Sequence, residues 1–379
     1  MARVTEPSFT VGIEEEYHLV DRATRDLASE PPASLMDECK AELEAQVSPE
    51  FLRTQIEVGT RVCTTLAEAR ADLARLRATV ARVAGRHGLA PIAAATHPFA
   101  DWDVQKPTAA DRYTTIARDL QMVGRRLVIC GMHVHVGIDD EELRIDLMNQ
   151  VAYFLPHLLA LSTSSPFWRG EDTGLKSYRV SVFNGLPRTG LPEMFASWGE
   201  YQRHIRMLTT AGLIDDATKL WWDIRPSARF PTLEMRITDI CTRLDDTIAI
   251  AALFRCLLRM LWRLRRNNQR WRLYARMLVE ENRWRAQRYG LDEGLVDFGK
   301  GTIVPYASLL EEMISLVADD AAHFGCEAEV AATRDILARG TSADRQRRIF
   351  SAAMTAGVAR RAALERVVDH LVAETVEGL

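Results

Sequence analysis

The chain of 379 residues is 47% hydrophobic, has a formal net charge of −4 at pH 7, and contains six scattered cysteines without a C-x-x-C pair. A chain of this length can bury about three quarters of its extended surface, which predicts a globular protein with reduced, packing cysteines. The small net charge argues against nucleic-acid binding, and the apolar stretches are too short to span a membrane. Because the N-terminal residues do not resemble a secretion signal, we expect a cytoplasmic protein.

The first part of the chain alternates predicted strands and helices. Alternating apolar residues predict strands over residues 9–20, 54–59, 89–96 and 127–138. Apolar residues at helical spacing predict helices over residues 64–84, 108–126 and 140–161. Strands and helices mixed in this way indicate an α+β fold.

The second part begins with a long segment, 162–198, that is rich in Ser, Gly, Pro and Asn and is predicted to be irregular. Residues 220–224 and 232–238 are predicted to pair as a hairpin, with 225–227 between them. Beyond Asp239 the chain is predicted to be helical throughout. We therefore expect a single domain over residues 1–379, with a sheet in about 1–240 and a helical layer in about 241–379.

Four predicted strands carry acidic or imidazole side chains on one face and apolar side chains on the other. Because residues i and i+2 of a strand share a face, Glu14, Glu16 and His18 lie together, although Glu15 interrupts the apolar face. The same rule pairs Gln55 with Glu57, His133 with His135, and Glu234 with Arg236. An antiparallel sheet with one solvent-exposed face would also show alternating polar and apolar residues, but such a face normally mixes Lys, Thr and Ser with its acidic residues.

This concentration of carboxylates predicts a cation site if the strands are neighbours. Ionised carboxylates two residues apart on a strand repel by roughly 2.5 kcal/mol at an effective dielectric near 20. Bound divalent cations would remove that cost, and an oxygen-rich ligand set with one imidazole selects Mg²⁺ or Mn²⁺. Zinc would need more His or Cys ligands than one H-x-H pair supplies.

Six segments stand in one order along the chain: GIEEE at 12–16, residues 50–57, GMHVHVG at 131–137, WDIRP at 222–226, LEMR at 233–236 and ENRWRA at 281–286. Together they resemble the type 2 glutamate-cysteine ligase family of carboxylate-amine ligases, within the glutamine-synthetase-like superfamily. The resemblance implies a curved antiparallel sheet with helices on one side and a helical C-terminal layer.

The resemblance also implies roles for single residues. The metal ligands would be Glu14, Glu16, Glu57, His133 and Glu234. Arg236 would contact the transferring phosphate, and Arg236 and Glu57 would be the catalytic residues. Binding of ATP or of the substrates is expected to involve Glu50, His135, Arg179, Asn184, Arg225 and Arg236, of which the resemblance favours Arg179 and Arg225. The alternative for His135 is a hydrogen-bonding residue of the sheet face.

The activity that the resemblance implies is an ATP- and Mg²⁺-dependent ligase, which joins glutamate to an amine such as that of cysteine through an acyl phosphate. Phosphoryl transfer of this kind needs positioning and charge neutralisation more than a nucleophilic side chain. Two alternatives are a guanidino-kinase-like phosphotransferase and a non-catalytic Mg-ATP-binding protein. The expected partners are small amino-acid substrates and a second copy of the chain in a homo-oligomer, with a dimer favoured.

Overall fold

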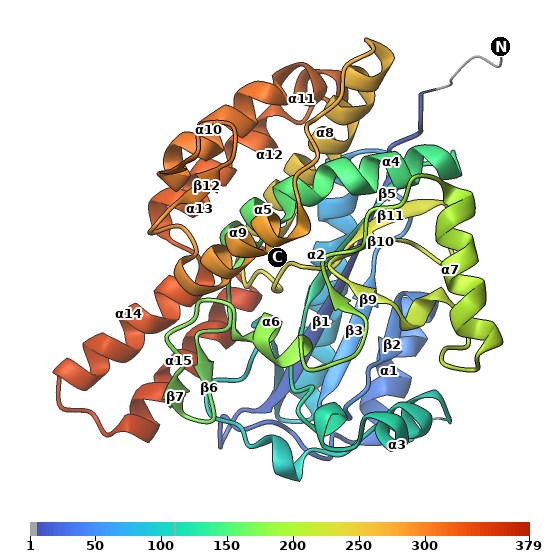
Figure 1. Ribbon diagram of the computed structural model, residues 1–379. Coiled ribbons are helices and arrows are strands. Elements are labelled where there is room, and N and C mark those ends of the chain that lie inside the picture. Colours follow the sequence, from blue (N-terminus) through green and yellow to red (C-terminus); the bar gives the residue numbers. More distant parts are fainter. Residues whose placement is uncertain (1–5, 110) are drawn as a thin grey trace.

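The computed structural model describes residues 6–109 and 111–379 and is built around a seven-stranded antiparallel sheet (Figure 1). The strands run in the order β10-β11-β5-β1-β3-β2, and β4 also pairs with β1. Their bounds are β1 Val11–Asp21, β2 Val47–Pro49, β3 Gln55–Gly59, β4 Leu89–Ile92, β5 Met132–Gly137, β10 Ile224–Pro226 and β11 Thr232–Met235. The expected α+β class with an antiparallel sheet is confirmed.

One face of this sheet is apolar and is covered by helices. Ile13, Ile56 and Val134 point from three neighbouring strands into the main core, where they are fully buried. The helices that pack against the sheet are α2 (Leu66–Arg86), α4 (Glu141–Val151) and α8 (Leu244–Arg266). Close packing on this side holds the strands in place, and with them the side chains of the opposite face.

The opposite face is divided between polar residues and a second, smaller apolar cluster. Val20 shares this face with Glu14 and Glu16, and it belongs to the same cluster as Ile92 of β4. Four buried side chains of the last helix, α15 (Arg360–Thr375), complete the cluster: Leu364, Val367, Val368 and Leu371. Helix α15 therefore covers the part of the face that lies beyond the acidic residues.

The remaining helices pack around the sheet and around the helices that cover it. They are α1 (Ala33–Leu43), α3 (Asp111–Arg125), α5 (Leu155–Ser162), α6 (Tyr178–Phe183), α7 (Trp198–Thr210), α9 (Arg276–Tyr289), α10 (Tyr306–Leu316), α11 (Ala318–Phe324), α12 (Glu327–Ala331), α13 (Thr333–Arg339) and α14 (Ser342–Thr355). Helices α10 to α13 gather on one side of the molecule, and α7 lies on the other (Figure 1). Within the described ranges, every helix is too short or too polar to cross a bilayer.

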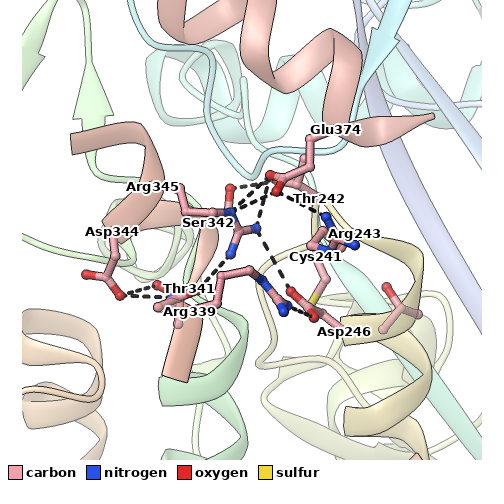
Figure 2. A network of polar contacts seen from close by, with 12 residues as sticks. Cys241, Thr242, Arg243, Asp246, Arg339, Thr341, Ser342, Asp344, Arg345 and Glu374 are labelled. Atoms are coloured by element: carbon pink, nitrogen blue, oxygen red, sulfur yellow. Dashed lines mark hydrogen bonds and ion pairs between the residues drawn. The ribbon is translucent and has the colours of Figure 1, made fainter. Parts of the chain in front are cut away.

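Ion pairs attach the C-terminal helices to the rest of the chain, as Figure 2 shows. Arg345 of α14 contacts Glu374 of α15, with its Nε atom 2.9 Å from Oε1. Arg339, at the end of α13, contacts Asp246 in the first turn of α8, with its Nη2 atom 2.5 Å from Oδ1. These contacts join the last three helices to the start of α8.

Two predictions of secondary structure were wrong. Arg225 and Pro226 lie in strand β10 rather than in the turn, and β10 pairs with β11 in the hairpin. The tail is not helical throughout, because α8 ends at Arg266 and strands β12 (Leu295–Asp297) and β13 (Thr302–Val304) form a further hairpin. Short strands have too few residues to show alternation, and pairing with a neighbour decides their structure.

Other elements were not anticipated. Helices α1 and α7 and strand β2 occupy stretches to which no element was assigned, and the segment predicted to be irregular contains α6. It also holds the two-residue strands β6 (Phe167–Trp168), β7 (Glu171–Asp172) and β8 (Thr189–Gly190), the last pairing with β9 (Trp221–Trp222). The pairing of β8 with β9 ties the loop-rich segment to the edge of the sheet where β10 begins.

Candidate active site

The polar face of the sheet forms the floor of a cavity of about 440 Å³. The predicted residues that line it are Glu14, Glu16, Glu50, Glu57, His133, His135, Arg179, Arg225, Glu234 and Arg236. Of the site residues predicted from the sequence, Asn184 alone does not line this cavity. Residues that are far apart in the chain therefore meet in one place.

Cross-strand register explains why these side chains meet. Glu16 of β1 lies opposite Glu57 of β3, and Glu14 lies opposite His133 of β5. Side chains directly opposite one another on adjacent strands have Cβ atoms about 5 Å apart. The neighbouring strands that the cation-site argument required are thus present.

Glu16, Glu50 and Glu57 form one acidic group, in which one carboxylate oxygen from each lies within 4.8 Å of the others. Burial raises the pKa of Glu57 well above its usual value, and repulsion from Glu50, Glu14 and Glu16 raises it further. Ser48 of β2 donates a hydrogen bond of 3.0 Å to Glu57 Oε1 and so helps to orient this carboxylate. A group of three carboxylates whose mutual repulsion opposes ionisation is electrostatically suited to a cation.

Glu14, His135 and Glu234 form a second group, whose potential ligand atoms also lie within 4.8 Å of one another. Glu14 lies between two imidazoles: its Oε2 is 3.2 Å from His133 Nδ1, and its Oε1 is 3.4 Å from His135 Nε2. Burial raises the pKa of Glu14, but the contacts with His133 and His135 outweigh burial and leave the pKa well below its usual value.

The two imidazoles differ in their surroundings. Burial lowers the pKa of His133, and Arg236 lowers it further. Burial alone would lower the pKa of His135 as well, but the contact with Glu14 outweighs burial and raises this pKa overall. His135 Nδ1 is 2.9 Å from the Thr232 hydroxyl, and its buried Nε2 atom faces Glu14 Oε1 at 3.4 Å. The contact with Thr232 therefore orients the ring so that its second nitrogen is directed at the Glu14 carboxylate.

Three arginines, two of them buried and the third nearly so, form the cationic side of the cavity. Arg225 Nε is 3.0 Å from Glu234 Oε2, and Arg236 also forms an ion pair with Glu234. Burial raises the pKa of Glu234, but Arg236 and Arg225 outweigh burial and lower it strongly overall. Arg179 donates to the carbonyl oxygens of Ile237 and Arg236, each at 3.2 Å. Arg225 of β10 and Arg236, the residue after β11, thus flank Glu234 of β11.

Gly131 leaves room for one of these arginines. A Cβ atom at this position would lie 2.3 Å from Arg179 Nη2, well inside the contact distance of real side chains. Because the Arg179 side chain is itself buried, it has little space to move aside. The glycine that opens the GMHVHVG segment therefore leaves the space that the Arg179 side chain occupies.

Sequence reasoning missed several residues that shape the site. Thr232 lies two residues before Glu234 on the same strand face, so alternation could have identified it. Ser48 had no such signal, because β2 is too short to show a pattern.

Asn184 caps the end of α6, and its Oδ1 accepts a hydrogen bond of 2.9 Å from Arg283 outside the cavity. Arg283 belongs to the ENRWRA segment at 281–286, but no role was predicted for it from the sequence.

Comparison with known proteins places the chain in a family. The sequence model of glutamate-cysteine ligase family 2 matches residues 10–370. A protein of Rhodospirillum rubrum, provisionally named glutamate–cysteine ligase 2, is 65% identical over 378 residues, covering 99% of this chain and 97% of its own length. A protein of Jannaschia sp. with the same provisional name is 58% identical and covers 96% of both chains.

A solved structure supports the fold at much lower sequence identity. The crystal structure of glutamate–cysteine ligase from Francisella tularensis in complex with AMP is 11% identical and superposes with a TM-score of 0.68. The match covers 98% of this chain and 90% of that one. At this identity the likeness concerns the fold alone, whereas the family match and the close relatives concern the sequence. The chain belongs to glutamate-cysteine ligase family 2.

Proposed function

We propose that this protein is an ATP-dependent carboxylate-amine ligase that joins the side-chain carboxylate of glutamate to the amine of cysteine. Membership of glutamate-cysteine ligase family 2 supports the reaction class. The observation that carries the proposal is the pairing of two acidic groups with three arginines in one cavity. With divalent cations held by the acidic groups, such a cavity can neutralise a triphosphate and a carboxylate at the same time.

The donor atoms fit magnesium. Glu16, Glu50 and Glu57 offer only oxygen, the ligand that Mg²⁺ and Mn²⁺ prefer. Glu14 and Glu234 add two more carboxylates, and His135 adds one imidazole whose Nε2 atom faces Glu14. Bound Mg²⁺ would supply charge neutralisation for the phosphates of ATP, and these residues would hold it.

The chain's own residues then have defined tasks. The substrate carboxylate attacks the γ-phosphorus of ATP, ADP leaves, and the amine attacks the carbonyl carbon of the acyl phosphate, which releases phosphate. Arg236 and Arg225 provide fixed positive charge beside the reacting phosphoryl group, and Glu234 holds both guanidinium groups in place. Arg179 lies in the same cavity and is suited to a substrate carboxylate, which a guanidinium can bind through two hydrogen bonds.

Three further assignments belong to this proposal. The six cysteines are all buried and none forms a disulfide, which fits a reducing compartment such as the cytoplasm. The partners are small amino-acid substrates together with ATP. We also propose a homo-oligomer, a dimer in the simplest case, on the basis of the family resemblance.

The test is ADP release with Mg-ATP, glutamate and a panel of amines that includes cysteine. The proposal predicts acceptor-dependent ADP, an equal amount of free phosphate and a γ-glutamyl amide. A phosphorylated acceptor would instead identify a phosphotransferase, and binding of Mg-ATP without any turnover would identify a non-catalytic protein. Glu234→Gln should abolish turnover, whereas Glu327→Gln, at an exposed position in the first turn of α12, should not.

A further inference from the structure

A buried arginine outside the cavity links the C-terminal layer to the cationic side of the site. Arg283 of α9 donates two hydrogen bonds to the Asp223 carboxylate, from Nε to Oδ2 at 2.6 Å and from Nη2 to Oδ1 at 3.1 Å. The two side chains are 9% and 3% exposed. Neither residue lines the cavity, so Arg283 cannot act by touching a ligand there.

The backbone of Asp223 is connected directly to the site. Its carbonyl oxygen accepts hydrogen bonds from the backbone N–H groups of Arg236, at 2.8 Å, and of Ile237, at 3.0 Å. Asp223 also immediately precedes β10, the strand that carries Arg225. Asp223 thus holds the start of β10, which carries Arg225, next to the segment after β11, which carries Arg236.

Arg283 reaches a third arginine through Asn184. Its Nη2 atom donates a hydrogen bond of 2.9 Å to Asn184 Oδ1, at the end of α6. Helix α6 carries Arg179, and Arg179 in turn donates to the carbonyl oxygen of Arg236. A single guanidinium therefore joins the segments that present Arg179, Arg225 and Arg236.

From these contacts we infer that Arg283 is a positioning residue for the reaction: through Asp223 and Asn184 it sets the relative placement of the three cavity arginines. The inference rests on the proposed ligase function. A planar guanidinium can satisfy a carboxylate and an amide oxygen at once in fixed directions, which a lysine ammonium cannot do. Arginines that stabilise a transferring phosphoryl group must be placed accurately, because a displacement of about 1 Å can cost about 100-fold in rate.

The test compares Arg283→Met with Arg345→Met. Arg345 is a matched control because it is also a buried arginine of the C-terminal layer that contacts a carboxylate, in its case Glu374 (Figure 2). Neither Arg345 nor Glu374 lines the cavity. Both substitutions should lower the urea midpoint of unfolding. Only Arg283→Met should lower kcat, by about 100-fold, with the KM for Mg-ATP changed by less than about threefold.

Arg283→Lys provides the second variant. It keeps the charge but not the forked geometry, and should lower kcat by at least about tenfold. If Arg283→Met does not fold, the comparison of Arg283→Lys with Arg345→Lys decides the question by the same criterion.

The possible results separate the two levels of the argument. A parent protein with no acceptor-dependent ADP release overturns the proposed function and this inference with it. An active parent whose Arg283 variants keep the kcat of the matched Arg345 variants overturns the inference alone. A loss of kcat confined to the Arg283 variants, at equal folded fraction, supports it.

Discussion

Arg77 and Glu15 form a fully buried ion pair directly behind the acidic face of the sheet. Arg77 Nη2 is 2.6 Å from Glu15 Oε1, and Arg77 Nε is 2.7 Å from Oε2. The Glu15 carboxylate also accepts hydrogen bonds from the hydroxyls of Tyr17, at 2.5 Å, and Thr247, at 2.8 Å. Because Glu15 stands between Glu14 and Glu16 on β1, this pair anchors the part of the strand that presents both cavity carboxylates.

Arg77→Met should lower the free energy of unfolding by about 3–5 kcal/mol, because it leaves the Glu15 carboxylate buried without its partner. The double variant Glu15→Gln/Arg77→Met removes both charges and should recover much of this loss. Urea denaturation of the parent and of the two variants measures both effects. A single-variant cost below about 1 kcal/mol would contradict the account.

Removing one acidic side chain should separate stability from cation binding. In the absence of Mg²⁺, Glu57→Gln should stabilise the protein, because burial and neighbouring carboxylates disfavour the charged form of Glu57 and raise its pKa. Mg²⁺ at about 100 times its Kd should stabilise the parent by about 3 kcal/mol, and the variant by much less. Thermal unfolding with and without Mg²⁺ makes the comparison, with Glu327→Gln as control. An equal Mg²⁺ effect in parent and variant would refute the site.

The sequence and the structure agree most closely where strands are long enough to show their period. Alternation along β1 and β5 identified the face that holds Glu14, Glu16 and His133, because burial of one face fixes the register. It could not place Arg225, which is expected in a turn unless its pairing with β11 is known. It also could not place Asn184, because a loop-rich segment takes its conformation from contacts such as that with Arg283.

The geometry and the family resemblance assign the imidazole ligand differently, and this can be tested. The resemblance implies His133, whereas the structure groups His135 with Glu14 and Glu234 and orients its ring through Thr232. His135→Ala should weaken Mn²⁺ binding by roughly 10- to 100-fold, and His133→Ala by less. Calorimetric titration with Mn²⁺ gives both affinities. The reverse order would restore the assignment to His133.

Acid should destabilise the fold through a histidine far from the site. Burial lowers the pKa of His157 to about 4, below the value of about 6.5 in the unfolded chain. The unfolded chain therefore binds the proton first, so this contribution to stability is present above about pH 6.5 and is lost as the pH falls toward about 4. His157→Leu should reduce the loss between about pH 7 and 4 by up to about 3 kcal/mol. Urea unfolding of the parent and the variant across this pH range measures the loss of stability. The same pH dependence in both proteins would exclude a contribution from His157.

The central claim is that the site activates a carboxylate as an acyl phosphate, and isotope transfer tests it most directly. Glutamate labelled with ¹⁸O in its side-chain carboxylate is incubated with the protein, Mg-ATP and cysteine, and the released phosphate is analysed by mass spectrometry. The account predicts one ¹⁸O atom in each phosphate, because the carboxylate oxygen that attacks phosphorus leaves with it. Amide formation with unlabelled phosphate would contradict the account.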